Sequence, residues 1–444
     1  MLSLLTRKRA FRPDFEAGRT AFAANDFVTA FQHWMPLAQA GEGQAEVQIG
    51  LMYITGRGVA ANPGDGAFWL RKAAGQGDVE AMYLLGQLLA TGRQPDVNDP
   101  ATRWRQEAVE AEPEVGEANF RLLFPHGLDV AVDHEEAAKW LTAAAERDHA
   151  GALTELGILY AQGHGVPQDA HKAIECYSRA AEKNFAPAQY NLGGMYLHGH
   201  GVAQDLARAR EWYTIAAEAG NAQGQFNLGL IYQNGQGVEK DSGRAAAWYR
   251  KAAEQGVVPA QVNLAIMYAN GDGIEKDVRQ SQRWFEAAAH QGDVNAQTNL
   301  GLLFARGIGG PPNHLEAVHW YRKAAEAGAL QAQVNLGQLY ATGVNGRRDY
   351  GEALRWFNEA ARRNHPIAQY NLGQLYAAGK GTGRNPQLAY FWLALALDKL
   401  PPGAERENAM LEAERLRGEL SDDALARVEE ALRADRAKLK LANA

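Results

Sequence analysis

The apolar residues of this chain recur in short strings that return every 36 residues. A clear copy is AQYNLG at 188–193, and related strings begin at 224, 260, 296, 332 and 368. At about 100° per residue, Ala188, Leu192 and Tyr196 fall on one arc of a helix, and Gly193 leaves room there for a neighbouring helix. The pattern therefore predicts one amphipathic helix at each string.

Tryptophan marks a second helix in each unit. Trp212 stands with Ala209, Tyr213, Ala216 and Ala217 in an i, i+3, i+4, i+7, i+8 stripe, which is typical of a helix with one buried side. Tryptophan recurs in this position at 104, 140, 248, 284, 320, 356 and 392, and Trp69 is one residue out of frame. Two helices of about 12–14 residues joined by a turn form a hairpin that cannot bury both apolar faces alone, so neighbouring hairpins must stack.

Glycine-containing turns separate the two predicted helices. Gly199 suits the left-handed conformation that ends a helix, and Gly201 provides a second permissive position. Asn345, at the second position in another unit, tolerates the same conformation and so supports a turn. An acid or amide then stands just before each second helix and is expected to cap it. These residues are Asp169, Asp205, Asp241, Asp277, Asn313, Asp349 and Asn385.

The array is regular over only part of its length. We predict a basic and apolar N-terminal segment at 1–13, degenerate repeats at 14–150, regular repeats at 151–403 and C-terminal capping helices at 404–444. The copy around 118, ANFRLL, has lost its glycine, and PDVNDP at 95–100 and FPHGLDV at 124–130 are expected to distort the stack. The sequence leaves open whether the repeats at 81–150 form a hinge or a binding site. The predicted fold is all-α, an α/α superhelical solenoid of about ten 36-residue helix-turn-helix repeats with a C-terminal helical cap.

The residues after Pro401-Pro402-Gly403 differ from the repeats. They predict two charged amphipathic helices, at 404–419 and 422–440, with Ser421 capping the second. Because the last hairpin of an open array would expose an apolar face, these helices are expected to cover it.

Composition and charge narrow the class of partner. Hydrophobic residues make up 46% of the 444 residues, and the net charge of −7 argues against a general nucleic-acid binder. No stretch approaches the roughly 18 apolar residues of a membrane span. Arg7, Lys8 and Arg9 beside Leu4 and Leu5 suit either a solvated terminus, the simpler interpretation, or peripheral contact with an anionic membrane. The expected location is the cytoplasm.

Motifs for catalysis, cofactors or metals do not stand out. Glycine-rich loops at 307–310 and 379–384 occupy the turn position and lack the strand and the Lys-Ser/Thr ending of a phosphate-binding loop. His164 and His200 occupy one position in adjacent repeats, so they are expected about 8–10 Å apart, too far to share a zinc ion. Cys176 is the single cysteine and stands in a tryptophan position, which predicts a small core residue. We predict no enzyme activity, no cofactor and no metal.

The first helices of stacked hairpins line the concave side of a solenoid, where we expect a protein or peptide partner to bind. The third and seventh residues of each string, and the polar residues four places later, point away from the predicted core. The alternative is that packing between first helices buries them. The predicted partner-binding residues are Tyr83, Phe120, Tyr190, His198, Phe226, Leu230, Asn234, Val262, Ile266, Asn270, Arg306, Val334 and Tyr370.

Two amide series repeat with the same period. Asparagine stands at 191, 227, 263, 299, 335 and 371, and glutamine stands two residues before each of them. Because such residues recur in every unit, we interpret both series as structural, with the asparagines bracing neighbouring loops.

The complete frame resembles the Sel-one-like repeat (SLR), a relative of the tetratricopeptide repeat. In the unit 222–256 the matching residues are Leu228, Gly229, Tyr232, Gly235, Gly237, Val238, Asp241, Ala245, Trp248, Tyr249, Ala252, Ala253 and Gly256. The resemblance implies a right-handed α-superhelix and a role as an adaptor or assembly scaffold. It also implies a second function, a modulator or enzyme acting on cell-wall or sugar ligands, although the cysteine-rich branch linked to β-lactam binding differs from this chain, which has one cysteine. A third function left open is a self-assembling structural element.

Overall fold

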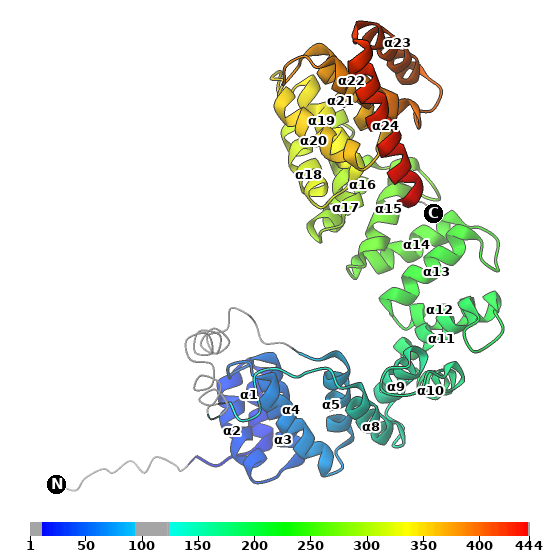
Figure 1. Ribbon diagram of the computed structural model, residues 1–444. Coiled ribbons are helices and arrows are strands. Elements are labelled where there is room, and N and C mark those ends of the chain that lie inside the picture. Colours follow the sequence, from blue (N-terminus) through cyan, green and yellow to red (C-terminus); the bar gives the residue numbers. More distant parts are fainter. Residues whose placement is uncertain (1–10, 94–121, 123, 443–444) are drawn as a thin grey trace. The chain divides into compact units, whose positions relative to one another are not determined.

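The structure is a computed structural model that describes residues 11–93, 122 and 124–442 (Figure 1). These residues form 22 α-helices, and within the described ranges β-pairing is limited to isolated bridges such as Arg93 with Val130. Contacts group the chain into two units, 1–228 and 229–444, and each unit is described by itself. The all-α prediction is confirmed.

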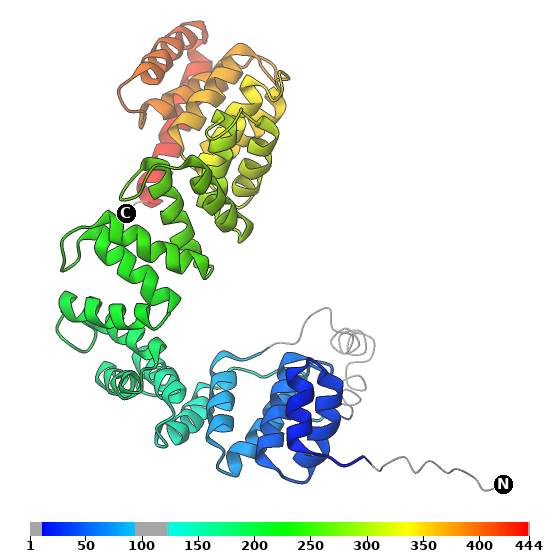
Figure 2. The same cartoon turned by 180° about the vertical axis from the view of Figure 1, so that it is seen from behind.

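The first unit consists of helical hairpins, of which α1 to α4 lie side by side (Figure 2). Its helices are α1 (Phe15–Ala23), α2 (Phe27–Gln39), α3 (Gly43–Thr55), α4 (Pro63–Gly75), α5 (Val79–Thr91), α8 (His134–Ala145), α9 (Ala150–Gln162), α10 (Ala170–Glu182), α11 (Ala186–His198) and α12 (Leu206–Glu218). Helix α13 (Ala222–Asn234) spans the division between the units.

The second unit continues the same alternation. Its helices are α14 (Ser242–Glu254), α15 (Val258–Asn270), α16 (Val278–His290), α17 (Val294–Arg306), α18 (His314–Glu326), α19 (Leu330–Thr342), α20 (Tyr350–Arg362), α21 (Pro366–Ala378), α22 (Pro386–Leu397), α23 (Ala404–Glu419) and α24 (Asp422–Ala442). From α9 to α21 the odd-numbered helices are called first helices here. Within each unit they pack against the even-numbered second helix of their repeat, as α11 does with α12 and α17 does with α18.

The predicted turn residues have the expected conformations. Gly199 ends α11 with φ 69°, Gly201 follows with φ 72°, and Asn345 has φ 49°. Asp205 accepts hydrogen bonds from the backbone N–H groups of Ala207 and Arg208 at the start of α12. All seven predicted capping residues, from Asp169 to Asn385, accept such a hydrogen bond at the start of a second helix. Helix boundaries therefore follow from local sequence.

A glycine in the first helix and an aromatic residue in the second set the closest approach within a hairpin. A Cβ atom placed on Gly193 would lie 2.8 Å from the ring of Tyr213, which is far inside van der Waals contact. The same relationship, with distances of 2.5–2.7 Å, joins Gly157 to Tyr177, Gly229 to Tyr249, Gly301 to Tyr321 and Gly337 to Phe357. Small residues at these positions therefore let an aromatic ring lie directly on the helix backbone.

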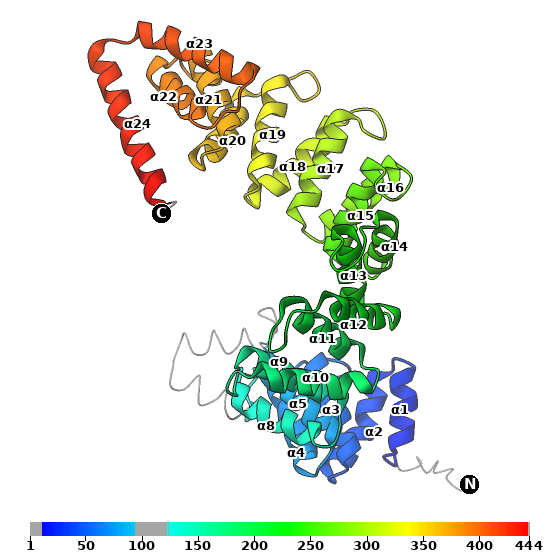
Figure 3. The same cartoon turned by 90° about the vertical axis from the view of Figure 1, so that its right-hand side faces the viewer.

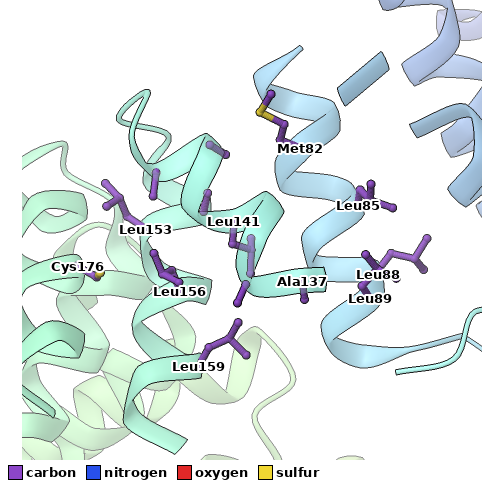
Figure 4. Packing of buried hydrophobic residues seen from close by; sticks show 14 of the residues in the cluster. Met82, Leu85, Leu88, Leu89, Ala137, Leu141, Leu153, Leu156, Leu159 and Cys176 are labelled. Atoms are coloured by element: carbon purple, nitrogen blue, oxygen red, sulfur yellow. The ribbon is translucent and has the colours of Figure 1, made fainter. Parts of the chain in front are cut away.

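The irregular region keeps this hairpin geometry across a long connection. Helix α5 packs directly against α8, although residues 92–133 separate them in sequence. A Cβ atom on Gly86 would lie 2.6 Å from Leu141, as in the regular repeats. Leu85 and Leu88 of α5 belong to one buried cluster with Leu141 and Ala137 of α8, and Figure 4 shows the two helices next to each other. The string at 118 lies outside the described residues.

The glutamine series joins successive hairpins. Gln189 is 2% exposed, and its amide nitrogen donates to the backbone carbonyl of Ala181 at the end of the preceding second helix, at 3.4 Å. The same bond recurs for Gln225, Gln261, Gln297, Gln333 and Gln369 at 3.1–3.2 Å. The structural interpretation of these residues is confirmed, because each satisfies a helix C-terminus.

The amide oxygen of each of these glutamines needs a hydrogen-bond donor from a second residue. In one repeat, Gln291 donates to Gln261 Oε1 at 2.9 Å from 30 positions further along the chain. The Oε1 atoms of Gln189, Gln297, Gln333 and Gln369 are buried without a partner among the described residues. In these four repeats the residue 30 positions later is Ala219, Ala327, Arg363 or Lys399, so no glutamine is present to donate.

A buried carboxylate replaces the glutamine in one repeat. Glu46 is fully buried, and its Oε2 accepts a 2.9 Å hydrogen bond from Gln76. Its Oε1 forms an ion pair with Lys72 Nζ at 2.7 Å, although the angles of this contact are not those of a hydrogen bond. Lys72 also donates to the Ala38 carbonyl at 3.1 Å. The ammonium group thus takes over the contact with the helix C-terminus that the glutamine amide makes elsewhere.

The C-terminal helices cover the last repeat, as predicted (Figure 3). Ala409, Ala413 and Leu416 of α23 share a buried cluster with Leu393 of α22. Val428 and Leu432 of α24 form a second cluster with Leu395. Ser421 accepts a hydrogen bond from Ala424 N at 3.4 Å at the start of α24.

Candidate interaction surface

The predicted partner-binding residues divide by their exposure. His198, Asn234, Ile266, Asn270 and Arg306 are exposed, and Tyr83, Tyr190, Phe226, Leu230, Val262 and Tyr370 are half-buried. Phe120 lies outside the described residues. The eleven predicted residues that are exposed or half-buried, together with Leu302, Gln338 and Gln374 at the seventh position of their strings, are called the first-helix strip below.

The inclusion of Val334 in the predicted site is wrong. Its side chain is 1% exposed and belongs to the buried cluster of α19, which includes Leu336 and against which Leu302 and Phe304 of α17 pack. Helices α17 and α19 contact each other directly, so this position is closed by the neighbouring first helix. The alternative noted from sequence, burial between first helices, therefore applies at this position.

The aromatic members of the strip also take part in packing. The rings of Tyr190 and Tyr213 are 5.7 Å apart, and those of Tyr83 and His149 are 4.6 Å apart. Burial, followed by the charges of Glu155 and Glu80, raises the pKa of Tyr83. Tyr83 and Tyr190 are half-buried and present only part of their ring surface to solvent.

The asparagine series forms hydrogen bonds within its own helix or with the second helix of the preceding repeat. Asn227, Asn299 and Asn371 each donate to the backbone carbonyl four residues earlier, at 2.9–3.0 Å. Asn263 and Asn335 form hydrogen bonds with Tyr249 of α14 and Tyr321 of α18, the second helices of the preceding repeats. The structural interpretation is confirmed, but the partners are helices and not the loops that we expected.

Charged residues are concentrated in the second helix of each repeat and are rare in the first. This difference is present in the sequence, but the sequence-based prediction of the site did not include it. The seven first helices α9 to α21 contain one acidic residue, Glu155, and one basic residue, Arg306, whereas each second helix from α10 to α20 contains three or four charged residues. About half of the exposed residues of the first helices are amides, as in Gln223, Asn234 and Gln338. The first-helix strip is thus accessible to solvent and almost uncharged.

A hollow of about 390 Å³ lies at the N-terminal end of the first unit. Phe15, Arg19 and Phe22 of α1 line it with Val47 of α3 and Trp34 of α2. Trp34 is 1% exposed, its indole N–H donates to the Phe15 carbonyl at 3.0 Å, and its ring lies 5.5 Å from that of Phe22. Trp34 lies in the degenerate repeats predicted at 14–150, and the sequence did not predict this hollow.

A second pocket, of about 300 Å³, lies between α4 and α8 and is lined by several acidic residues. Asp133 caps α8 by accepting from Glu136 N at 2.8 Å, and Glu136 binds Arg71 through two hydrogen bonds of 2.9 Å. The hydrogen bonds from Arg71 lower the pKa of Glu136, whereas burial raises the pKa of Asp65 nearby. The acidic groups Asp133 and Glu136 are thus held in structural contacts.

Two pairs of histidine rings are stacked in the structure. His164 stacks on His134 with ring centroids 4.7 Å apart, and His198 stacks on His200 at 5.5 Å. Gly165 lies against the His134 backbone, so the turn of one repeat contacts the start of the preceding second helix and brings the two rings together. Among the residues that the structure describes, no three histidine, cysteine, aspartate or glutamate side chains are placed to hold a metal ion. Nor does any helix in those ranges have the length and hydrophobicity to cross a membrane.

The fold and the strip define an α-solenoid repeat protein. A family model for the Sel1 repeat matches residues 43–78, 79–102, 123–149, 150–185, 186–221, 222–257, 258–293, 294–328, 330–365 and 366–399. The chain belongs to the Sel1 repeat family, as the resemblance predicted. The matches at 79–102 and 123–149 contain α5 and α8, which the structure pairs as one hairpin.

Solved structures of the same class are similar along most of the chain. One is c5321, a protective antigen of uropathogenic Escherichia coli strains with an SLR fold, at 30% identity, a TM-score of 0.52, and coverage of 94% of this chain and 93% of that one. Another is a Sel1 repeat protein from Oxalobacter formigenes, at 29% identity, a TM-score of 0.50, and coverage of 78% of this chain and 89% of that one. Comparison with curated proteins gives no match.

Proposed function

We propose that this protein is a scaffold or adaptor that binds a segment of a partner protein on its first-helix strip. The observation that supports this most directly is the near absence of charge on exposed positions of seven successive first helices. Charged residues normally cover the solvent-exposed faces of soluble proteins, and their depletion, together with aromatic residues and arginine, is typical of the centre of a protein interface. A Sel1 repeat array supplies such positions at a regular spacing.

Two isoleucines provide a test of the strip. Ile266 on the first helix α15 and Ile215 on the second helix α12 are each 41% exposed. We expect Ile266→Glu to abolish co-purification of a partner, because a carboxylate buried against a protein surface without a counter-charge opposes binding. Ile215→Glu is the matched control and should leave the partner bound.

The measurement is affinity capture followed by mass spectrometry, with circular dichroism showing that both variants are folded. A partner must be retained by the unchanged protein and by Ile215→Glu, and lost with Ile266→Glu. Equal retention by both variants would remove the first-helix strip as the binding surface.

The remaining functions stay as proposals of lower rank. An enzyme or modulator acting on cell-wall or sugar ligands would need free acidic groups, and those of Asp133 and Glu136 are engaged in structural hydrogen bonds. Self-assembly is tested by the mass of the protein in solution. The single, buried Cys176 suits the cytoplasm, where thiols are kept reduced.

A further inference from the structure

We propose that the segment bound by α15 and α17 in the second unit is an uncharged, extended peptide with aliphatic side chains. This inference rests on the proposed function and names the chemistry of the partner. It concerns the part of the first-helix strip formed by Val262, Ile266, Asn270, Leu302 and Arg306.

The absence of charge limits what can bind. Helix α15 contains no charged residue, and α17 contains only Arg306. A lysine or glutamate side chain of a partner would lose its hydration on this surface without gaining an ion pair, which opposes binding. Electrostatic attraction also cannot steer a charged segment to a neutral surface. Charged side chains of the bound segment are therefore expected to point into solvent or to be missing.

Arg306 does not alter this conclusion, because its charge acts within its own repeat. It lies in the last turn of α17, where a cation interacts favourably with the helix C-terminus. Burial raises the pKa of Tyr321 to about 12, and the Arg306 charge partly offsets that rise, so the guanidinium group lies near this ring. The cation is thus in the last turn of α17, at the edge of the strip.

Aliphatic side chains from the two helices supply the contact area. Val262 of α15 packs against the buried cluster that contains Ala296 and Leu300 of α17, so this cluster joins the two helices. Ile266 is 41% exposed one turn further along α15, and Leu302 is half-buried on α17. Apolar side chains of a partner segment would gain the hydrophobic free energy of covering these residues.

The polar groups match a peptide backbone better than a glycan. Asn270 is exposed on the same strip, and an amide both donates and accepts, as backbone N–H and C=O groups require. Counted from the starts of the repeated strings at 260 and 296, the third and seventh residues are Val262, Ile266, Thr298 and Leu302. None of these four positions has an aromatic ring on which a sugar could stack. Neither helix has an acidic group to accept from sugar hydroxyls.

The test is selection of a random-peptide library displayed on phage against the full-length protein, followed by fluorescence anisotropy with the selected peptides. We expect Asp, Glu, Lys and Arg to fall to about half of their frequency in the unselected library or lower, since the strip has no acidic residue and its one cation, Arg306, lies at its edge in the last turn of α17. We also expect Kd to change by less than about twofold between about 50 mM and 500 mM salt. Enrichment of charged residues, or a tenfold or larger weakening with salt, would overturn the inference.

A variant tests the charge argument in the opposite direction. Ile266→Glu should weaken the selected peptides by about tenfold or more, and a new selection on that variant should enrich lysine and arginine, which can pair with the added carboxylate. Ile215→Glu should select the same uncharged peptides as the unchanged protein. Identical selections from all three proteins would place the peptides elsewhere and overturn the inference.

Failure of the inference differs from failure of the proposed function. Charged peptides that bind the strip would leave the scaffold function standing and reject the uncharged partner. Binding of neutral oligosaccharides on a glycan array, lost with Ile266→Glu, would reject a peptide partner in favour of a glycan. Recovery of no peptide by any of the proteins would count against both proposals.

Discussion

The backbone of Gly193 in α11 lies against the ring of Tyr213 in α12, so that a Cβ atom on the glycine would be 2.8 Å from ring carbon Cδ1. The next residue, Gly194, has only the Tyr213 hydroxyl within reach, at 3.6 Å. Two adjacent glycines of one helix therefore have different roles. Gly193 fixes the spacing of the hairpin, whereas Gly194 faces away from the closest contact.

These two glycines give a matched test of hairpin packing. Gly193→Ala should destabilise the protein by about 1–3 kcal/mol, because the added methyl group must displace a buried ring. Gly194→Ala should raise the stability by about 0.5–1 kcal/mol, because alanine is the better helix former and has room there. Urea unfolding followed by circular dichroism measures both. Equal effects of the two substitutions would contradict the proposed role of Gly193.

The unpaired glutamine oxygens predict a stabilising substitution. Ala219 follows α12 with φ −73° and ψ 1°, close to the φ −84° and ψ 5° of Gln291, which donates to Gln261. Ala219→Gln should supply the missing donor to Gln189 Oε1 and stabilise the protein by about 0.5–1.5 kcal/mol. Gln291→Ala should destabilise it by a similar amount. If neither Ala219→Gln nor the equivalent Ala327→Gln raises the stability, these oxygens are satisfied by other means.

The buried Glu46 predicts a strong dependence on Lys72. Lys72→Met should destabilise the protein by about 3 kcal/mol, because it leaves a buried carboxylate without its counter-charge. The double variant Glu46→Gln with Lys72→Met should regain most of the loss, since glutamine occupies this position in the regular repeats. Thermal unfolding of the three proteins measures the coupling. If the single and double variants unfold at the same temperature, the ion pair has no structural role.

Cys176 should be inert in the folded protein. Its side chain is 8% exposed, and burial raises the pKa of its thiol to about 11, so almost no thiolate is present at neutral pH. We expect no reaction with iodoacetamide until the protein unfolds, and full reaction in concentrated guanidinium chloride. Because the folded pKa exceeds the ordinary value of 9.0, the unfolded state loses its proton first, and this group's contribution to stability declines as the pH rises from about 9 towards 11. Rapid labelling of the folded protein would contradict the burial.

The C-terminal cap can be tested with two leucines. Leu432 of α24 is 3% exposed and packs near Leu395, whereas Leu411 of α23 is 67% exposed. Leu432→Ala should destabilise the protein by about 2–4 kcal/mol, since it leaves a cavity under the cap. Leu411→Ala should change stability by less than about 0.5 kcal/mol. Native-state hydrogen exchange in α22 would show whether the loss at Leu432 is confined to the cap.

Sequence periodicity predicted the helices, their capping residues and the buried stripe because these depend on interactions within a few residues. Asp205 caps α12 through bonds to residues two and three positions later, and Gly199 ends α11 through its own φ angle. The charge difference between first and second helices was also present in the sequence. It needed only the assignment of helices to become visible.

The exposure of individual first-helix residues could not be predicted in the same way. Val334 and Val262 are the same residue type at the same position of the repeat, yet Val334 is fully buried and Val262 is half-buried. The difference arises because Leu302 and Phe304 of the neighbouring α17 pack against the cluster that contains Val334. The pairing of α5 with α8 and the stacking of His134 on His164 likewise join residues from different segments.

The sequence by itself determined the repeat, the helix ends, the family and the neutrality of the first helices, since each is a property of local order along the chain. The tertiary structure alone decided which positions of the first-helix strip stay open, which glutamine oxygens find a donor, and how Glu46 is compensated. The physical reason is that burial and hydrogen bonding at these positions depend on side chains that neighbouring hairpins bring together, and a period of 36 residues does not specify those side chains.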